Sequence, residues 1–278
     1  MRPFGLIFAA SFWASLSGLV LAQGPSAPQA SAQQPNYQPG WPCTGRERSF
    51  DPAYAKVAEA TGGHLVLLDR SEVRVWSTLY AGDSGHKSTI VRAAGKIDSY
   101  VDIPFWVDSS VESLFVVASL QCMQTIFLYD PQRSGVDAKS PGMLDDWFRA
   151  GRISTVPMPQ AGSWVLRLLG TGQYSVAVQA NSNARLGTVD RKGNTLSIWP
   201  GESTADPVFR LVNAAGEPIR TLALAQDPDS PGHYNGTFEP PTVSFRVQAE
   251  WRAANGEIVW RTDPRLMEPA SPAAAPSK

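Results

Sequence analysis

Alternation of apolar and polar residues with a period of two, broken by turn-forming clusters, is the feature that most constrains this fold. From Ile97 onward, segments rich in β-branched and aromatic residues recur at 99–107, 113–120, 125–129, 152–158, 163–169 and 173–180. Clusters of Asp, Pro, Ser and Gly separate them, at residues 107–110, 130–135 and 159–162. Short strands at this spacing predict a β-sandwich.

A second series of the same kind begins after Gly187. Its segments are residues 195–199, 208–212, 219–224, 234–238, 245–252 and 258–262, and hairpin signals lie at 213–216 and 254–256. We therefore expect a mainly β fold with two consecutive β-sandwich domains, the second one immunoglobulin-like. Their expected bounds are residues 95–182 and 183–267.

The residues before the strands predict a short α/β segment over 43–94. Asp51 is suited to cap a helix that Gly62 and Gly63 end, because glycine readily adopts the left-handed conformation. Residues 65–68 are apolar and predict a short buried strand, and residues 71–80 predict a second helix.

The first residues of the chain have the pattern of an export signal. Arg2 precedes an apolar stretch without acidic residues, which predicts a signal peptide over residues 1–22, cleaved after Ala22. The alternative is an uncleaved anchor, since the stretch approaches the ~20 residues that span a bilayer. With cleavage, the chain is exported, periplasmic or extracellular, and has no membrane span.

Polar, Pro-rich residues predict a disordered linker over 23–42 and a disordered tail over 268–278.

The chain has two cysteines, Cys43 and Cys122. In an oxidising compartment such a pair usually forms a disulfide, which we expect here. Two buried free thiols are the alternative, because the sequence does not give the distance between them.

The composition disfavours two classes of protein. A formal net charge of -1, with 18% charged residues, argues against a nucleic-acid partner, which requires a basic surface. A hydrophobic content of 43% argues against a disordered chain, since it is sufficient for a core.

Several stretches resemble, in order along the chain, parts of one family. Residues 50–63 resemble the last helix and turn of a von Willebrand factor type A domain. The strings VDSSVESL (107–114), FLYDP (127–131), PQAGSWVLR (159–167) and GQYSV (172–176) resemble the sandwich that follows that domain in hemicentin-like proteins. FRVQAEWRAANG (245–256), with Trp260 and Arg261, resembles the last strands of the immunoglobulin-like domain of those proteins.

The resemblance covers residues 50–264 and implies adhesion or matrix-like interaction. The sandwich is also similar to bacterial pre-peptidase C-terminal domains. One departure matters: a type A domain binds a metal through an Asp-x-Ser-x-Ser loop. The nearest string, which starts at Asp108, has Glu112 in place of the last serine. The resemblance therefore implies no metal ligand in this chain.

No spacing typical of a catalytic or cofactor site is visible, so we expect no enzymatic activity, no cofactor and no metal. His64, His86 and His233 do not have zinc-ligand spacing, and there is no Cys-x-x-Cys or Gly-x-Ser-x-Gly. His233 is assigned to a turn. Because a hydrolytic triad is defined by geometry, one assembled from distant residues stays open as an alternative.

Other strings have both a functional and a structural interpretation. Residues 82–88 resemble a phosphate-binding loop, but His86 replaces the required glycine, which favours a solvated loop. Asn235 begins a glycosylation acceptor pattern, but Asn-Gly also forms tight turns, which we favour. Three carboxylates suit either a calcium site or, as we expect, a solvated insertion: Asp137, Asp145 and Asp146.

These observations predict an exported, non-enzymatic binding or structural module whose partner is a protein or a glycan. Core packing is the expected role for most of the tryptophans, among them Trp147, Trp164 and Trp199. The candidate partner-binding residues are Trp251, Arg252, Trp260 and Arg261, which fall on neighbouring predicted strands. Alternatives are a carbohydrate-binding protein with exposed tryptophans and an accessory module of a secreted enzyme.

Overall fold

Two short helices precede the strands in the computed structural model, which describes residues 52–269 except 69, 73, 86–87 and 201–204. The helical elements are α1 (Pro52–Thr61), a 3₁₀ turn η1 (Arg70–Glu72) and α2 (Val75–Gly85). Gly62 ends α1 with a φ of 77°, as the sequence predicts. The predicted strand at 65–68 is absent: these residues have no regular structure.

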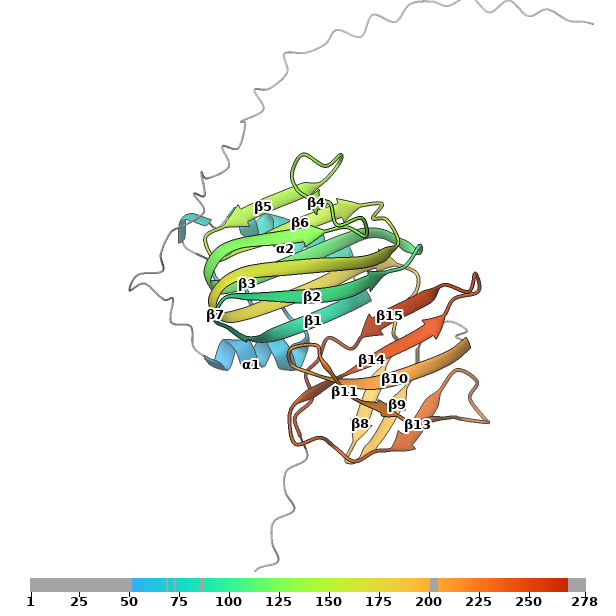
Figure 1. The fold of residues 1–278 in the computed structure, drawn as a ribbon. Coiled ribbons are helices and arrows are strands. Elements are labelled where there is room, and N and C mark those ends of the chain that lie inside the picture. The colour runs from blue at the N-terminus through green and yellow to red at the C-terminus, as the bar shows by residue number, and fades with distance from the viewer. Residues whose placement is uncertain (1–51, 69, 73, 86–87, 201–204, 270–278) are drawn as a thin grey trace, which may run out of the picture. The chain divides into compact units, whose positions relative to one another are not determined.

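The first sandwich is built from one antiparallel sheet that folds over on itself (Figure 1). Its strands are β1 (Ser88–Ile97), β2 (Tyr100–Val107), β3 (Val111–Tyr129), β4 (Gly135–Val136), β5 (Leu144–Phe148), β6 (Gly151–Pro157) and β7 (Gly162–Ser182). The order is β1-β7-β3-β6-β5, while β2 pairs with β7 and β4 pairs with β3.

Strands β3 and β7 are long and pair with each other along their length, so both layers share them. The first half of β7 pairs with β2 and its second half with β1. The ladder between β3 and β7 changes register at Leu120/Cys122 and Met123/Thr125, opposite Gly170 with a φ of 145°. A Cβ on Gly170 would lie 2.0 Å from the Cys122 carbonyl oxygen, so glycine is required at this bend.

The core of the first sandwich lies between its layers, where residues of one parity on β3 and β7 point inward. It includes Leu114, Val116, Ile126, Leu166 and Val178. Residues of the other parity on the first half of β3, such as Phe115, are covered by α2 and residues 66–68 in a separate apolar cluster. On the second half of β3, the face that carries Phe127 is not covered by a helix among the elements described.

The second sandwich consists of two four-stranded sheets that enclose their own core. One has the order β11-β10-β14-β15 and the other β12-β13-β9-β8. The strands are β8 (Val189–Lys192), β9 (Thr195–Ile198), β10 (Ala205–Asn213), β11 (Pro218–Leu222), β12 (Ala225–Gln226), β13 (Tyr234–Thr237), β14 (Phe245–Arg252) and β15 (Ile258–Thr262). The prediction of a mainly β fold with two sandwiches is therefore confirmed. The preceding segment, predicted as α/β, has no strand before β1 among its described residues.

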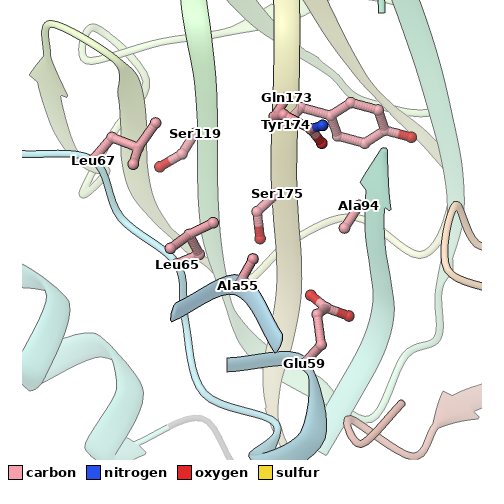
Figure 2. A pocket seen from close by; sticks show the side chains of 9 residues that line it. All are labelled: Ala55, Glu59, Leu65, Leu67, Ala94, Ser119, Gln173, Tyr174 and Ser175. Carbon is pink, nitrogen blue, oxygen red and sulfur yellow. The ribbon is translucent and has the colours of Figure 1, made fainter. Parts of the chain in front are cut away.

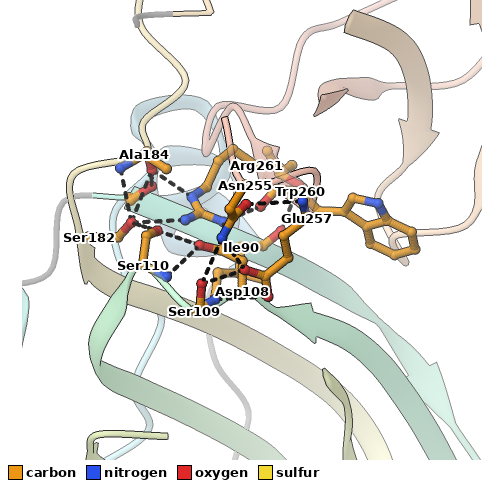
Figure 3. A network of polar contacts seen from close by, with 12 residues as sticks. Ile90, Asp108, Ser109, Ser110, Ser182, Ala184, Asn255, Glu257, Trp260 and Arg261 are labelled. Carbon is orange, nitrogen blue, oxygen red and sulfur yellow. Dashed lines mark hydrogen bonds and ion pairs between the residues drawn. The ribbon is translucent and has the colours of Figure 1, made fainter. Parts of the chain in front are cut away.

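A buried ion pair joins the two sandwiches, which belong to one compact unit (Figure 3). Arg261 of β15 donates to Asp108, at the end of β2, over 2.6 Å, and both side chains are almost fully buried. Arg261 also donates to Ser182 Oγ and to the Ala184 carbonyl. The Thr262 hydroxyl donates to the Ile90 carbonyl over 2.9 Å.

A second buried charge cluster links α1 to both sandwiches. Glu59 of α1 pairs with Arg92 of β1 and with Arg246 of β14, and both arginines are fully buried. Burial lowers the pKa of Arg246 to about 10, although Asp263 opposes this shift. One carboxylate of α1 therefore neutralises charge that both sandwiches bury.

Candidate functional site

The four predicted partner-binding residues do not form one exposed surface. Trp251 is 5% exposed and belongs to the core of the second sandwich, and Arg261 is buried in the ion pair with Asp108. Trp260 is half-buried, and only Arg252 is exposed. This corrects the expected surface: β14 alternates between the core and the outside, and Trp251 points inward.

A surface rich in aromatic residues lies instead on the first sandwich. Three adjacent strands, β2, β7 and β3, share an outer face, whose side chains we call the aromatic face. They are Tyr100 and Asp102 of β2, Arg167 of β7, and Phe127 and Tyr129 of β3. Tyr100 is 61% exposed and Phe127 is 40% exposed. The rings of Phe127 and Tyr129 stack with centroids 5.9 Å apart.

An ion pair occupies the centre of the aromatic face. Arg167 donates from Nε and Nη2 to the two carboxylate oxygens of Asp102, over 2.6 and 2.7 Å. Its guanidinium lies 5.6 Å from the Tyr100 ring centre and 5.9 Å from that of Tyr129. The hydrogen bond from Arg167 lowers the pKa of Asp102, and the same bond raises the pKa of Arg167.

These contacts hold the Arg167 side chain in one position without burying it. The bidentate pair fixes the guanidinium plane, and the tyrosine rings attract its charge through their π faces. The aromatic face therefore presents a fixed, half-exposed cation among flat apolar rings. Such a surface is suited to recognition, because little side-chain freedom remains to be lost on binding.

The small cavity shown in Figure 2 cannot hold an organic ligand. It measures about 50 Å³ and lies between α1, residues 65–67 and the sheet. Its lining includes Glu59, Ser119 and Tyr174, and the Ser119 hydroxyl has no hydrogen-bond partner there. The volume and this free hydroxyl suit a bound water, whereas ligand pockets usually measure about 300–1,000 Å³.

In the structure, the residues that resembled a phosphate-binding loop or a calcium site have other roles. Gly82 lies inside α2 rather than in a loop, and residues 86–87 lie outside the described part of the chain. Asp145 is buried and pairs with Arg152, while Asp146 accepts a hydrogen bond from Thr78. Within the described residues, no three His, Cys, Asp or Glu side chains are grouped to hold a metal.

Two further assignments concern single residues. Asn235 lies in strand β13, so its predicted tight turn is absent. Cys122 is buried in β3 and is not a free thiol, and Cys43 lies outside the described residues, so the Cys43–Cys122 bridge stays a prediction.

Comparisons with known proteins assign no family to this chain. No protein-family model matches it, and no curated protein matches it. The lipase BlEst2 from Bacillus licheniformis, in its propeptide form, is 13% identical over 63% of this chain and 40% of the lipase, with a TM-score of 0.34. A β-glucuronidase from Ruminococcus gnavus, in complex with D-glucuronic acid, is 10% identical over 59% of this chain and 35% of the enzyme, with a TM-score of 0.20.

The chain thus spans less than half of each of these two proteins, and neither likeness is close enough to assign an activity. The class that the fold defines is a mainly β protein of two sandwiches. The described residues include no helix with the length and apolar character of a membrane span.

Proposed function

We propose that this chain is an exported binding module that engages a protein partner through the aromatic face. The observation that carries the proposal is the exposed pair of rings, Tyr100 and Phe127, beside the fixed guanidinium of Arg167. Tyrosine and arginine are enriched among the residues that dominate protein interfaces. The role proposed for this face is binding without catalysis. The resemblance to hemicentin-like proteins supports an adhesion-type role.

A photo-crosslinking amino acid at position 127 is expected to capture a specific protein from envelope or extracellular extracts. The same probe at position 243 is the control, because Val243 is also exposed but lies outside the aromatic face. With the purified partner, Tyr100→Ala is expected to weaken binding about thirtyfold, which corresponds to an interface hot spot of about 2 kcal/mol. Equal capture from both positions, or unchanged affinity, would contradict the proposal.

A carbohydrate is the second candidate partner, because flat exposed rings beside a paired carboxylate and guanidinium also suit a sugar. Glycan-array binding that is lost in Tyr100→Ala and kept in Val243→Ala would favour this candidate. An empty array together with a captured protein would leave the protein partner as the function.

Export and a Cys43–Cys122 disulfide belong to the same proposal. We expect the purified secreted protein to show no reactive thiol when unfolded without reductant. Cys122→Ser is expected to lower the free energy of unfolding by about 2–4 kcal/mol, and reduction of the wild-type protein should have a similar effect. The detection of two thiols in the unreduced, unfolded protein would show that no bridge forms.

A further inference from the structure

One cluster on the second sandwich has the arrangement of a nucleophile, a base and an orienting carboxylate. The Ser197 hydroxyl of β9 lies 2.6 Å from Nε2 of His233. Nδ1 of the same imidazole lies 3.1 Å from a carboxylate oxygen of Asp227. The three residues are thus connected as hydroxyl, imidazole and carboxylate, although Ser197 is far from the other two in the sequence.

The hydrogen bonds specify which atom carries each proton. A carboxylate only accepts, so Nδ1 donates to Asp227, and in the neutral imidazole Nε2 is then the acceptor for the Ser197 hydroxyl. The backbone amide of Asp229 and the His233 side chain lower the pKa of Asp227, in that order of importance, so Asp227 is charged at neutral pH. The imidazole is therefore oriented as a base toward Ser197.

The backbone explains why these residues meet. Asp227 and His233 close a turn in which the Asp227 amide donates to the His233 carbonyl over 2.8 Å. Next to this turn, β13 pairs with β9, with Asn235 directly opposite Ser197. Directly opposed residues have Cβ atoms about 4.5–5.5 Å apart and project from the same face of the sheet, so the Asn235 side chain starts next to that of Ser197.

Solvent reaches the cluster. Leu196 and Ile198, on either side of Ser197, point into the core, so Ser197 points to the outer face of its sheet. The Asp227 side chain is 25% exposed and that of His233 is 15% exposed. The Trp199 ring stacks on the imidazole with centroids 4.5 Å apart and an interplanar angle of 13°, and it is 42% exposed.

We propose that Ser197 and His233 are catalytic residues for hydrolysis of carboxylic esters, with Asp227 as the positioning residue. This activity goes beyond the binding function and departs from the expectation that the chain lacks a reactive centre. The chemistry needs no cofactor, and the order of groups is the one that activates a serine. Asn235 is placed to donate a hydrogen bond to the oxyanion, and Trp199 offers a flat surface to an apolar substituent.

The reaction balances with water as the only co-reactant. Ser197 Oγ forms a bond to the ester carbonyl carbon while its proton moves to His233 Nε2. The tetrahedral intermediate then breaks the bond to the leaving oxygen, which takes that proton and departs as the alcohol. Water, deprotonated by the same nitrogen, attacks the acyl-serine, and the acid leaves as Ser197 regains its proton.

A fluorophosphonate probe tests the nucleophile directly. We expect the full folded chain to be labelled at Ser197, identified by mass spectrometry of the peptide, and to hydrolyse p-nitrophenyl acetate. Ser197→Ala is expected to abolish both, and His233→Ala is expected to lower the hydrolysis rate at least 100-fold. Ser244→Ala is the matched control, because that hydroxyl bonds to the Glu268 carboxylate without an imidazole.

Asp227→Asn tests the positioning role separately from folding. We expect kcat to fall at least 100-fold with little change in KM, and the imidazole ¹⁵N spectrum to lose the tautomer with the proton on Nδ1. A folded wild-type chain that is not labelled at Ser197, or is labelled equally in Ser197→Ala, would overturn the proposal. So would wild-type activity in a folded His233→Ala variant, since the hydrogen bonds would then only hold the turn. None of these results depends on the aromatic face.

Discussion

Asp108→Asn is expected to lower the free energy of unfolding by about 3–5 kcal/mol, because it leaves the Arg261 guanidinium charged, buried and unpaired. Arg261 has no exposed surface and Asp108 almost none, so water does not replace the lost carboxylate. The pair also joins the two sandwiches, since Asp108 directly follows β2 and Arg261 lies on β15. Urea unfolding followed by tryptophan fluorescence measures the change.

Arg220→Ala is the control for this prediction. Its partner Glu239 is 86% exposed, so loss of the pair should change stability by no more than about 1 kcal/mol. Simultaneous replacement of Asp108 and Arg261 by Leu and Met should recover much of the stability, because neither partner then leaves an unpaired buried charge at this position. If Asp108→Asn were as mild as Arg220→Ala, the buried pair would not hold the sandwiches together.

Phe115→Ala is the second substitution with a large expected effect, again about 3–5 kcal/mol. The Phe115 ring is fully buried between β3 and α2, and a Cβ on Gly82 would lie 1.9 Å from it. A packed helix lies directly on the ring, so the neighbours cannot collapse into the cavity that alanine leaves. Chemical denaturation, with the helical signal recorded in parallel, tests the expected loss.

Phe127→Ala on the same strand is the matched control. Phe127 is 40% exposed, so its removal should cost far less stability while altering the aromatic face. Similar losses in both variants would mean that α2 does not cover Phe115 as tightly as the structure indicates.

The sequence predicted most strands, because alternation with a period of two reports which side of a strand is buried. The predicted segments 245–252 and 258–262 coincide with β14 and β15. The sequence pattern predicted two shorter strands in place of β3, however, and two in place of β7. Polar Gln121 and the glycines at 170 and 172 interrupt the alternation at the bend, where the strands continue with a change of register.

The candidate sites were less predictable because they depend on distances across strands. Trp251 and Arg261 suggested a binding surface, but alternation on β14 and the position of Asp108 make both residues internal. Ser197, Asp227 and His233 are separated along the chain, and only the pairing of β9 with β13 brings them together. A sequence motif with fixed spacing does not describe such a pairing between strands.

Strands β3 and β7, which both layers of the first sandwich share, determine how early during synthesis this sandwich can fold. Val111 at the start of β3 pairs with Ser182 at the end of β7, so the longest ladder waits for residues made much later. Synthesis proceeds from the N-terminus, and until then the apolar face of β3 must stay in contact with water or a chaperone. Such distant pairing makes folding slow. A chain truncated before residue 182 therefore lacks the partner that its first half needs, and cannot yield an isolated first sandwich.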